Sequence, residues 1–267
     1  MKTSRLTAIA TAALLTSVLA ACGSSDDDGA ATSELAAVKE AGVLKVGTEG
    51  TYAPFTFHDS KTNELTGYDV EVAKAIGKEL GVEVEFSETP WDAIFAGLTS
   101  KRFDIVVNQV TKNEERAGLY GLSQTYTWSE GVIATRSDDD SINSLADLKG
   151  KKSAQSITSN WAQVAKDAGA NVQSVEGLTQ AVTLLKQKRV DATVNDSLAI
   201  LDYQKSTGDD SIKVAAKTGD ISEQVVATRK DSDLVAAIDE ALTTLTKDGT
   251  LATISKTYFD SDVTVAP

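Results

Sequence analysis

Short apolar runs alternate with amphipathic runs from residue 43 onward, and this alternation predicts an α/β fold. In the first part of the chain, Ile105, Val106 and Val107 show no polar alternation, which suits a strand covered on both faces. Strands are expected at residues 43–48, 55–57, 82–86 and 104–107, and helices from residues 67–69 to Gly81 and at 91–101. Strands and helices in this order indicate βαβ units and a mostly parallel sheet.

The pattern restarts after a polar break at residues 136–143. Ser144 and Asp147 predict the start of a short helix. Further strands are expected at residues 151–155, 172–175, 190–194 and 224–228, and further helices at 160–168, 178–187, 197–205, 232–247 and 251–258. The sequence therefore predicts two similar α/β lobes.

An internal similarity supports the two lobes. Residues 101–108 (KRFDIVVN) are similar to residues 188–195 (KRVDATVN), and each run follows an amphipathic helix. Chance similarity between two buried strands is the alternative explanation. If the repeat is structural, two strand ends face each other across a cleft, with Arg116 near one end and the carboxylate of Asp196 at the other. A cation and an anion on opposite walls suit a zwitterion such as a free amino acid.

The segment after residue 107 becomes fully polar and predicts an anion site. Thr111 followed by Glu114 is the pattern of a capping box, so a helix is expected to begin there. Ligands of open α/β sheets bind outside the carboxyl ends of the strands, and helix N-termini attract anions. Arg116, in the second helical turn, is placed to bind a carboxylate. An ordinary strand–turn–helix with a surface arginine explains the same residues equally well.

The N-terminus has the pattern of a bacterial lipoprotein signal. Lys2 and Arg5 precede an apolar run at residues 6–19, and LAAC follows at residues 19–22. The run is too short for a spanning helix. We expect a signal peptide at residues 1–21, cleavage before Cys22 and diacylglycerol on its sulfur, followed by a flexible tether, so that residues 22–39 are lipidated cysteine and tether. A plain signal peptide that contains a cysteine is the weaker alternative.

Composition and charge exclude several classes of function. Loss of Lys2 and Arg5 with the signal peptide takes the net charge from −13 to −15, which argues against nucleic acid and against adsorption to anionic lipid. Cys22 is the only cysteine and His58 the only histidine, so no Ser-His-Asp or Cys-His catalytic arrangement is available. We expect no catalytic residue, no metal site and no cofactor.

Several motifs in order resemble the family 3 solute-binding proteins of bacterial ABC importers, which take polar amino acids. GYDVEV at residues 67–72, with Ile76, Gly77 and Leu80, fits the family signature. The similarity extends over residues 44–258 and includes YAPF at 52–55, NEER at 113–116, SLADLKGK at 144–151 and KDGT at 247–250. NQVT at 108–111 and QSITSNW at 155–161 look most similar to the cystine-binding branch.

The resemblance implies a type II periplasmic-binding-protein fold of two lobes, each a mostly parallel sheet flanked by helices. Lobe 1 is expected at residues 40–126 and 227–267, and lobe 2 at residues 131–222. Two hinge crossings, at residues 127–130 and 223–226, are expected to join them. Closure about this hinge buries the ligand between the lobes, as in periplasmic binding proteins.

The resemblance also implies a clamp for the α-carbon of the ligand. Arg116 matches the arginine that grips the α-carboxylate, and Thr111 with the backbone at Thr158 and Ser159 completes this grip. Asp196 matches the carboxylate that takes the α-ammonium, assisted by the strand end at Gln109.

The remaining expected site residues surround the ligand side chain. Tyr52 and Trp91 match aromatic positions that sandwich it, although without the resemblance Tyr52 is more often a core residue. Glu49 and Asn195 match positions that vary with the ligand, and Asn108 belongs to the site through the NQVT motif.

The expected function is capture of a polar amino acid, with L-cystine as the best match, and its delivery to the permease of an ABC importer. Glutamine or another polar amino acid is the alternative ligand. A lyase or dehydratase that uses Glu49 or Asp196 on the same fold, and a sensory or adhesion lipoprotein, are the alternative functions. We expect a monomer outside the cytoplasm that contacts the cell membrane only through its lipid anchor.

Overall fold

The first described element is a helix where a tether was expected. The computed structural model describes residues 33–267, so the predicted signal peptide, Cys22 and most of the tether lie outside the described residues. Residues 34–39 belong to helix α1 (Glu34–Ala41), and the tether prediction was wrong for them. Ser33 caps this helix by accepting a hydrogen bond from the Ala36 N–H, and Gly42 ends it in the left-handed conformation. Only Val38 is buried, which explains the weak apolar pattern.

The remaining elements largely follow the predicted alternation. The strands are β1 (Val43–Thr48), β2 (Thr51–Tyr52), β3 (Thr56–His58), β4 (Leu65–Thr66), β5 (Glu83–Glu88), β6 (Ile105–Thr111), β7 (Tyr120–Arg136), β8 (Lys152–Gln155), β9 (Asn171–Ser174), β10 (Thr193–Asp196) and β11 (Ile212–Arg229). The helices are α2 (Tyr68–Leu80), α3 (Trp91–Thr99), α4 (Glu114–Leu119), α5 (Asn160–Asp167), α6 (Leu178–Lys186), α7 (Ser197–Thr207), α8 (Leu234–Lys247) and α9 (Thr250–Phe259), with a 3-10 turn at Leu145–Leu148.

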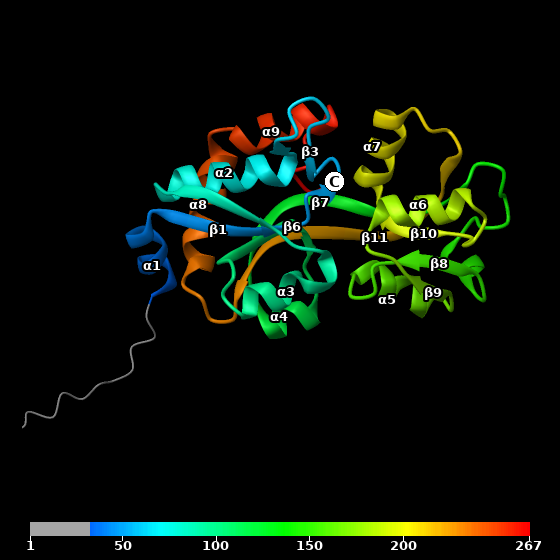
Figure 1. The fold of residues 1–267 in the computed structure, drawn as a ribbon, viewed down its shortest axis with the longest axis horizontal. Coiled ribbons are helices and arrows are strands. Elements are labelled where there is room, and N and C mark those ends of the chain that lie inside the picture. The colour runs from blue at the N-terminus through cyan, green and yellow to red at the C-terminus, as the bar shows by residue number, and fades with distance from the viewer. Residues whose placement is uncertain (1–32) are drawn as a thin grey trace, which may run out of the picture. The chain divides into compact units, whose positions relative to one another are not determined.

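One six-stranded sheet runs through the described residues in the order β10-β7-β11-β6-β1-β5 (Figure 1). We call the elements before β7, together with α8 and α9, the first half, and the elements between β7 and β11 the second half. In the first half, β1 pairs in parallel with both β5 and β6. In the second half, β8 pairs in parallel with β9 and, through Ser153 and Ala192, with the residue before β10. Each half therefore has the expected parallel strands.

Strands β7 and β11 join the two halves. They pair with each other in antiparallel fashion, from Tyr120 opposite Arg229 to Arg136 opposite Ile212. β11 also pairs with β6 of the first half, and β7 pairs with β10 of the second half. The expected crossings at residues 127–130 and 223–226 lie inside these two strands. The sequence did not predict their length, because both strands mix polar and apolar residues without a sustained period.

Helices cover both faces of the sheet in the first half. α2, α8 and α9 lie on one face, and α3 and α4 lie on the other (Figure 1). On the α3 side, Phe103 is fully buried and belongs to one core cluster with Ile94 and Leu98. The second half has its own cluster around Ile133 and Val194. The apolar stripes read from the sequence are thus the faces that pack on the sheet.

The internal repeat is structural. Lys101 and Lys188 both adopt the left-handed conformation, with φ of 61° and 57°. The carboxylate of Asp104 accepts a hydrogen bond from the backbone N–H of Lys45 at 3.0 Å, and the carboxylate of Asp191 accepts one from the N–H of Lys152 at 2.8 Å. The same turn therefore leads into β6 and into the segment before β10.

The capping box predicted at Thr111 is wrong. β6 continues through Thr111, and α4 begins at Glu114 with Asn113 as its N-cap, whose side chain accepts a hydrogen bond from the Arg116 N–H at 2.8 Å. The pairing of β11 with β6 extends to Thr111, opposite Gln224, and holds this residue in the strand. Arg116 still lies in the first turns of the helix.

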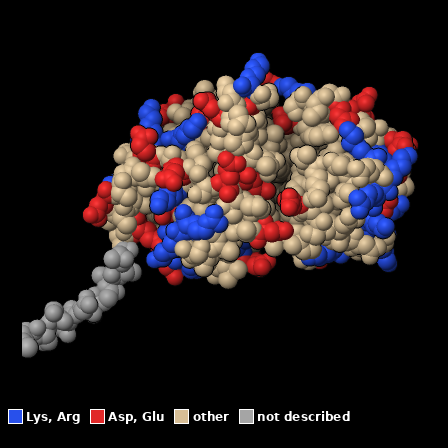
Figure 2. All heavy atoms as spheres, in the orientation of Figure 1, with Lys and Arg blue, Asp and Glu red and all other residues tan. Residues whose placement is uncertain are grey.

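The surface of the described residues is hollowed between the two halves on the face shown in Figure 2, and Asp and Glu side chains border the hollow. Among residues 33–267, no helix is long and apolar enough to cross a membrane.

Two helical glycines give a matched test of the packing at Phe103. A Cβ at Gly97 in α3 would lie 2.6 Å from the Phe103 ring, whereas a Cβ at Gly118 in α4 meets nothing within 4 Å. We expect Gly97→Ala to destabilise the protein by about 1–3 kcal/mol through overpacking. Gly118→Ala should stabilise it by about 0.5–1 kcal/mol through helix propensity. Urea denaturation measures both, and an equal effect of the two substitutions would contradict this packing.

Candidate functional site

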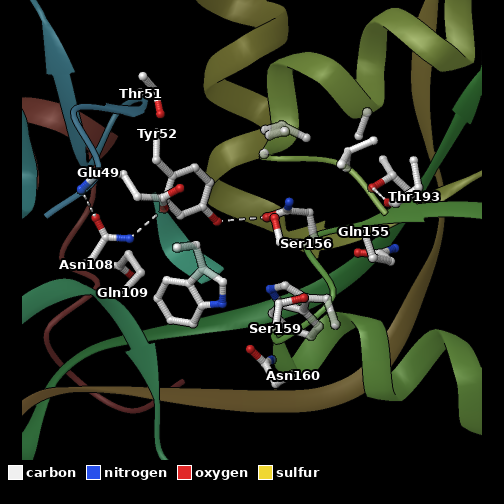
Figure 3. Close-up of a pocket in the computed structure, with 18 residues that line it drawn as sticks. Glu49, Thr51, Tyr52, Asn108, Gln109, Gln155, Ser156, Ser159, Asn160 and Thr193 are labelled. Carbon is white, nitrogen blue, oxygen red and sulfur yellow. Dashed lines mark hydrogen bonds between the residues drawn. The ribbon is translucent and has the colours of Figure 1, made fainter. Parts of the chain in front are cut away.

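A small inner cavity lies between the two halves. Its volume is about 60 Å³. Seven of the predicted site residues line it: Glu49, Tyr52, Trp91, Asn108, Gln109, Ser159 and Asn195. Figure 3 shows Glu49, Asn108 and Gln109 on one side of the cavity, with Gln155, Ser156, Ser159 and Asn160 across from them. The two halves therefore contribute opposite walls, as the expected cleft requires.

Direct hydrogen bonds hold the two walls together. The Tyr52 hydroxyl donates to Asn195 Oδ1 at 2.8 Å, and the Thr158 hydroxyl donates to Asp92 Oδ1 at 2.6 Å. Asp92 also accepts from the Thr158 backbone N–H at 3.3 Å. A carboxylate of the protein thus occupies the Thr158 donors that were expected to hold a ligand carboxylate.

A larger outer groove of about 580 Å³ continues from the inner cavity. Trp91 and Ser159 line both spaces, and Arg116 and Thr158 line only the groove. Arg116 is 6% exposed, its guanidinium donates to the Thr111 backbone carbonyl at 2.7 Å, and its Cζ lies 5.2 Å from the Trp91 ring centroid. Burial lowers the pKa of Arg116 to about 10, so the group remains a cation at neutral pH. Its remaining donors are available to an anion in the groove.

Thr111 and Asp196 line neither space. Asp196 is 1% exposed and caps α7, with one carboxylate oxygen accepting from the Leu198 N–H at 2.9 Å and the other from the Ser129 hydroxyl. Burial raises the pKa of Asp196 to about 6, and its hydrogen bonds oppose this shift. The Thr111 hydroxyl donates to Gln224 Oε1 at 3.1 Å. Both residues are therefore behind the cavity wall in this closed arrangement.

Glu49, like Asp196, is a carboxylate that has no ion-pair partner among the described residues. Asn108 donates to it at 2.7 Å, and the Asn108 amide oxygen is fixed by the Thr48 hydroxyl and the Glu49 N–H at 3.0 and 2.8 Å. Burial raises the pKa of Glu49 to about 7, against the effect of the Asn108 hydrogen bond. The ion pairs within residues 33–267 include neither Glu49 nor Asp196.

Asp69 supports the site from behind and was missed by the sequence analysis. Its carboxylate accepts from the Gln109 N–H and from the Gln109 side-chain amide, both at 2.8 Å, and from the Tyr126 hydroxyl at 2.8 Å. These bonds hold Gln109 in the left-handed conformation at φ 48°. Burial raises the pKa of Asp69 to about 7. GYDVEV contains this residue, but the motif was interpreted only as a family signature and a helix start.

Two buried polar atoms at the cavity have no partner among the described residues: Trp91 Nε1 and Gln109 Oε1. Each side chain is 7% exposed and lines the inner cavity. An unpaired buried donor or acceptor costs about 1–3 kcal/mol. A bound molecule that supplies an acceptor to the indole and a donor to the amide removes this cost.

The inner cavity also contains residues that the sequence analysis did not assign to the site. They include Gln155, Ser156, Trp161, Thr193 and Leu178. Asn160, which was expected to offer a polar group to the far end of cystine, does line the cavity. Gln155, Ser156 and Trp161 were singled out only within the QSITSNW motif, for its resemblance to the cystine-binding branch, and the apolar α6 residues were given no role. No group of His, Cys, Asp and Glu suited to a metal ion is found in the described part of the chain.

The model of the bacterial extracellular solute-binding proteins, family 3, matches residues 44–261. The chain belongs to this family. The L-cystine-binding protein TcyA of Bacillus subtilis is 49% identical to this solute-binding protein over 251 residues, which cover 92% of this chain and 93% of TcyA. The predicted two-lobe, type II periplasmic-binding-protein fold is confirmed by the family and by the solved structures that share it.

Two solved structures indicate which state of the cleft is present. An ancestral arginine-binding protein bound to arginine is 38% identical, with a TM-score of 0.77 over 82% of this chain and 98% of that protein. The L-cystine solute receptor of Neisseria gonorrhoeae in its unliganded open conformation is more similar in sequence, at 45%, but has a TM-score of 0.58 over 84% and 95%. The arrangement of the halves is therefore closer to a ligand-bound relative than to an open one.

Glu49→Gln is expected to stabilise the free protein at high pH. Because the pKa of Glu49 rises from 4.5 to about 7 on folding, the folded state holds more protons than the unfolded state between these values, and the free energy of unfolding falls as the pH rises through this window. A shift of this size corresponds to about 3 kcal/mol. The variant has no titrating carboxyl at this position and lacks this loss. Its free energy of unfolding should therefore exceed that of the wild type by about 1–3 kcal/mol at pH 8 and differ little from it below pH 4.5.

Urea denaturation from pH 4 to 8 measures this difference. Glu40→Gln, at an exposed position of α1, is the control and should leave the free energy of unfolding nearly unchanged. Parallel pH profiles for the wild type and Glu49→Gln would show that the Glu49 carboxylate carries no burial cost.

Proposed function

We propose that this solute-binding protein captures a free amino acid between its halves and delivers it to the permease of an ABC importer. The observation that carries the proposal is that the buried cation Arg116 and the carboxylates of Glu49 and Asp196 all lack an ion-pair partner among the described residues. Buried charges are normally paired. A zwitterionic ligand supplies the carboxylate for Arg116 and, once the cavity wall in front of Asp196 opens to admit it, the ammonium for Asp196.

The ligand we propose is L-cystine. TcyA and the gonococcal receptor are named for this ligand. Cystine carries a second ammonium, for which Glu49 and the unpaired Gln109 Oε1 offer acceptors, and Trp91 Nε1 offers a donor to a carboxylate. Sulfur packs favourably against aromatic rings, and Tyr52 and Trp91 border the same cavity. Ligand entry has to widen this cavity, since about 60 Å³ is too small for an amino acid of this size.

We also propose that the protein works outside the cytoplasm as a monomer held by lipid on Cys22. The support is the LAAC sequence at residues 19–22 after an apolar run. In the proposed division, residues 40–126 and 227–267 form lobe 1, residues 131–222 form lobe 2, and the crossings are the hinge. Incorporation of a labelled fatty acid that persists in Cys22→Ser would contradict the anchor.

A thermal-shift panel tests the ligand. We expect L-cystine to raise the melting temperature of the purified protein more than glutamine, arginine or histidine. A ligand at a hundred times its dissociation constant stabilises a protein by about 2.7 kcal/mol. A shift with glutamine or arginine alone would reject cystine and keep amino-acid binding. No shift with any amino acid would reject the proposed function.

Unchanged ligand is expected after incubation with the protein, because we propose binding without turnover. One solved neighbour is an ancestral amino-acid-binding protein described as a precursor of cyclohexadienyl dehydratase, with 32% identity and a TM-score of 0.77, so an enzyme on this fold is the competing proposal. Mass spectrometry of the recovered ligand distinguishes the two, since a lyase or dehydratase would release a converted product.

Arg116→Ala should weaken amino-acid binding by about 3–5 kcal/mol, the usual loss when one partner of a desolvated ion pair is removed. Asp196→Asn should be similarly severe for amino acids and mild for analogues without an α-ammonium. Titration calorimetry measures both. Arg102→Ala, at an exposed arginine in the turn after α3, is the matched control and should bind as the wild type does. Unaltered affinity of Arg116→Ala would remove this residue from the site.

A further inference from the structure

Gln224 lies at the point where the two halves meet. It is in the middle of β11, it is 1% exposed, and it stands opposite Thr111 of β6 on one side and Thr127 of β7 on the other. It lies in the expected hinge crossing at residues 223–226, and no motif in the sequence pointed to it. Its buried amide contacts Thr111 of the first half and Asp196 of the second half.

A continuous chain of hydrogen bonds passes through this amide. The Thr111 hydroxyl donates to Gln224 Oε1 at 3.1 Å. Gln224 Nε2 donates to Ser129 Oγ at 3.2 Å and to Asp196 Oδ2 at 3.5 Å. The Ser129 hydroxyl donates to the same Asp196 oxygen. At the other end, the Arg116 guanidinium donates to the Thr111 carbonyl at 2.7 Å.

The chain has one consistent direction. The Asp196 carboxylate only accepts, Ser129 gives its single proton to that carboxylate, and Thr111 gives its single proton to Gln224. The residue between them must therefore accept on one side and donate on the other. An amide does both at once, whereas an ionised carboxylate only accepts, and a methionine sulfur accepts weakly and cannot donate. Hydrogen bonds that point the same way along a chain polarise one another.

We propose that Gln224 is a positioning residue that couples the two ends of the ligand clamp. It acts through Thr111, which lies beside Arg116 in the first half, and through Asp196 in the second half. This inference rests on the proposed function, in which Arg116 and Asp196 bind the two charged groups of the ligand. Because Gln224 lies on a strand that crosses between the halves, its amide bonds to both ends of the clamp in the arrangement that the structure shows. It thereby aligns the cationic and anionic ends before and during ligand binding.

Gln224→Glu makes the coupling depend on pH. At pH 8 the new carboxylate cannot donate to Ser129, and it faces Asp196, so L-cystine binding should weaken by about tenfold to a hundredfold. At pH 5 a protonated glutamic acid has one donor and one acceptor and restores the pattern, so most of the loss should be recovered. Gln224→Met should weaken L-cystine binding equally at both pH values. Each dissociation constant, measured by titration calorimetry, is taken relative to the wild type at the same pH, which removes the titration of groups that residue 224 does not contact, such as Glu49. Asp196 contacts residue 224, so its titration is part of the measured effect.

Gln204→Glu is the matched control. Gln204 is a part-buried amide on α7 that donates to the Ile212 carbonyl at 2.8 Å, away from the clamp. The affinity of the Gln204→Glu variant for L-cystine, relative to that of the wild type, should be the same at both pH values. The proposal would be overturned if Gln224→Glu had the same affinity for L-cystine as Gln224→Met at both pH values. It would also be overturned if Gln224→Glu bound L-cystine as tightly as the wild type does.

A ligand-free measurement separates this inference from the proposed function. In the free protein, Thr111→Val and Asp196→Asn should show a coupling of about threefold to tenfold in the unfolding equilibrium constant, and this coupling should vanish when Gln224 is methionine. If the wild type binds no amino acid but the coupling behaves in this way, the proposed function fails and the positioning role of Gln224 stands. A coupling that persists in Gln224→Met overturns the role of Gln224.

Discussion

The antiparallel pairing of β7 with β11 is the constraint on which the rest of the structure depends. Both strands pass from one half to the other, so the register between them fixes how the halves face each other. The first half attaches to this pair through β6 and the second half through β10. The ladder is irregular between Lys217 and Ile221 and again between Gln224 and Val225. Such irregularities bend and twist a strand, and they lie in the part of the six-stranded sheet that passes from one half to the other.

Charge burial between the halves gives the cleft its chemistry. Arg116 stacks on Trp91 and keeps its charge, while burial raises the pKa of Glu49, Asp69 and Asp196. Folding alone does not favour such carboxylates, because desolvation is costly unless a cation compensates it. In the function we propose, a ligand ammonium compensates it at Glu49 and Asp196. The arrangement that weakens the free protein is therefore the one that favours a zwitterion in the closed cleft.

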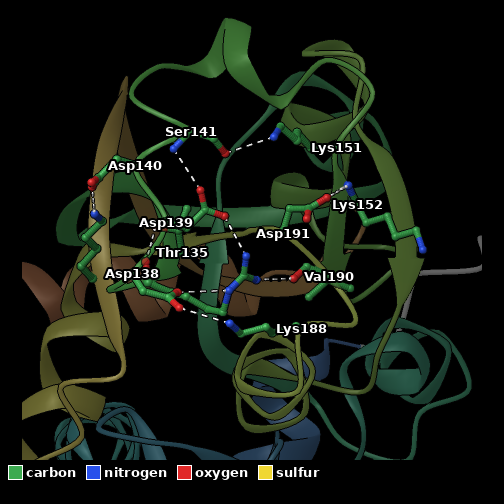
Figure 4. Close-up of polar contacts among 12 residues, drawn as sticks. Thr135, Asp138, Asp139, Asp140, Ser141, Lys151, Lys152, Lys188, Val190 and Asp191 are labelled. Atoms are coloured by element: carbon green, nitrogen blue, oxygen red, sulfur yellow. Dashed lines mark hydrogen bonds and ion pairs between the residues drawn. The ribbon is translucent and has the colours of Figure 1, made fainter.

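The same turn, held by an Asp carboxylate, leads into a strand in each of the two halves. Asp104 and Asp191 each anchor a strand start to the backbone of the neighbouring strand, and Figure 4 shows Asp191 bonded to Lys152. In the second half this turn sits beside Arg136, which pairs with Asp139 at 2.8 Å and donates to the Val190 carbonyl at 2.9 Å. These contacts tie the end of β7 to the segment before β10. Strand β10, which carries Asn195 and Asp196, is thereby fixed to the crossing strand β7.

The sequence by itself determined the elements whose pattern is local. Apolar stripes predicted α2, α6 and α8, an unbroken apolar run predicted β6, and Gly81 marked a helix end, because period and capping depend on near neighbours. It also pointed to Arg116 and Asp196 as opposite charges on two strand ends. Only the tertiary structure decided the length of β7 and β11, the N-cap at Asn113 and the line from Thr111 through Gln224 to Asp196. The strand lengths, the continuation of β6 through Thr111 and the bond from Thr111 to Gln224 depend on the pairing of β11 with β6 and β7, which are far away along the chain. No local period in the chain encodes such pairing.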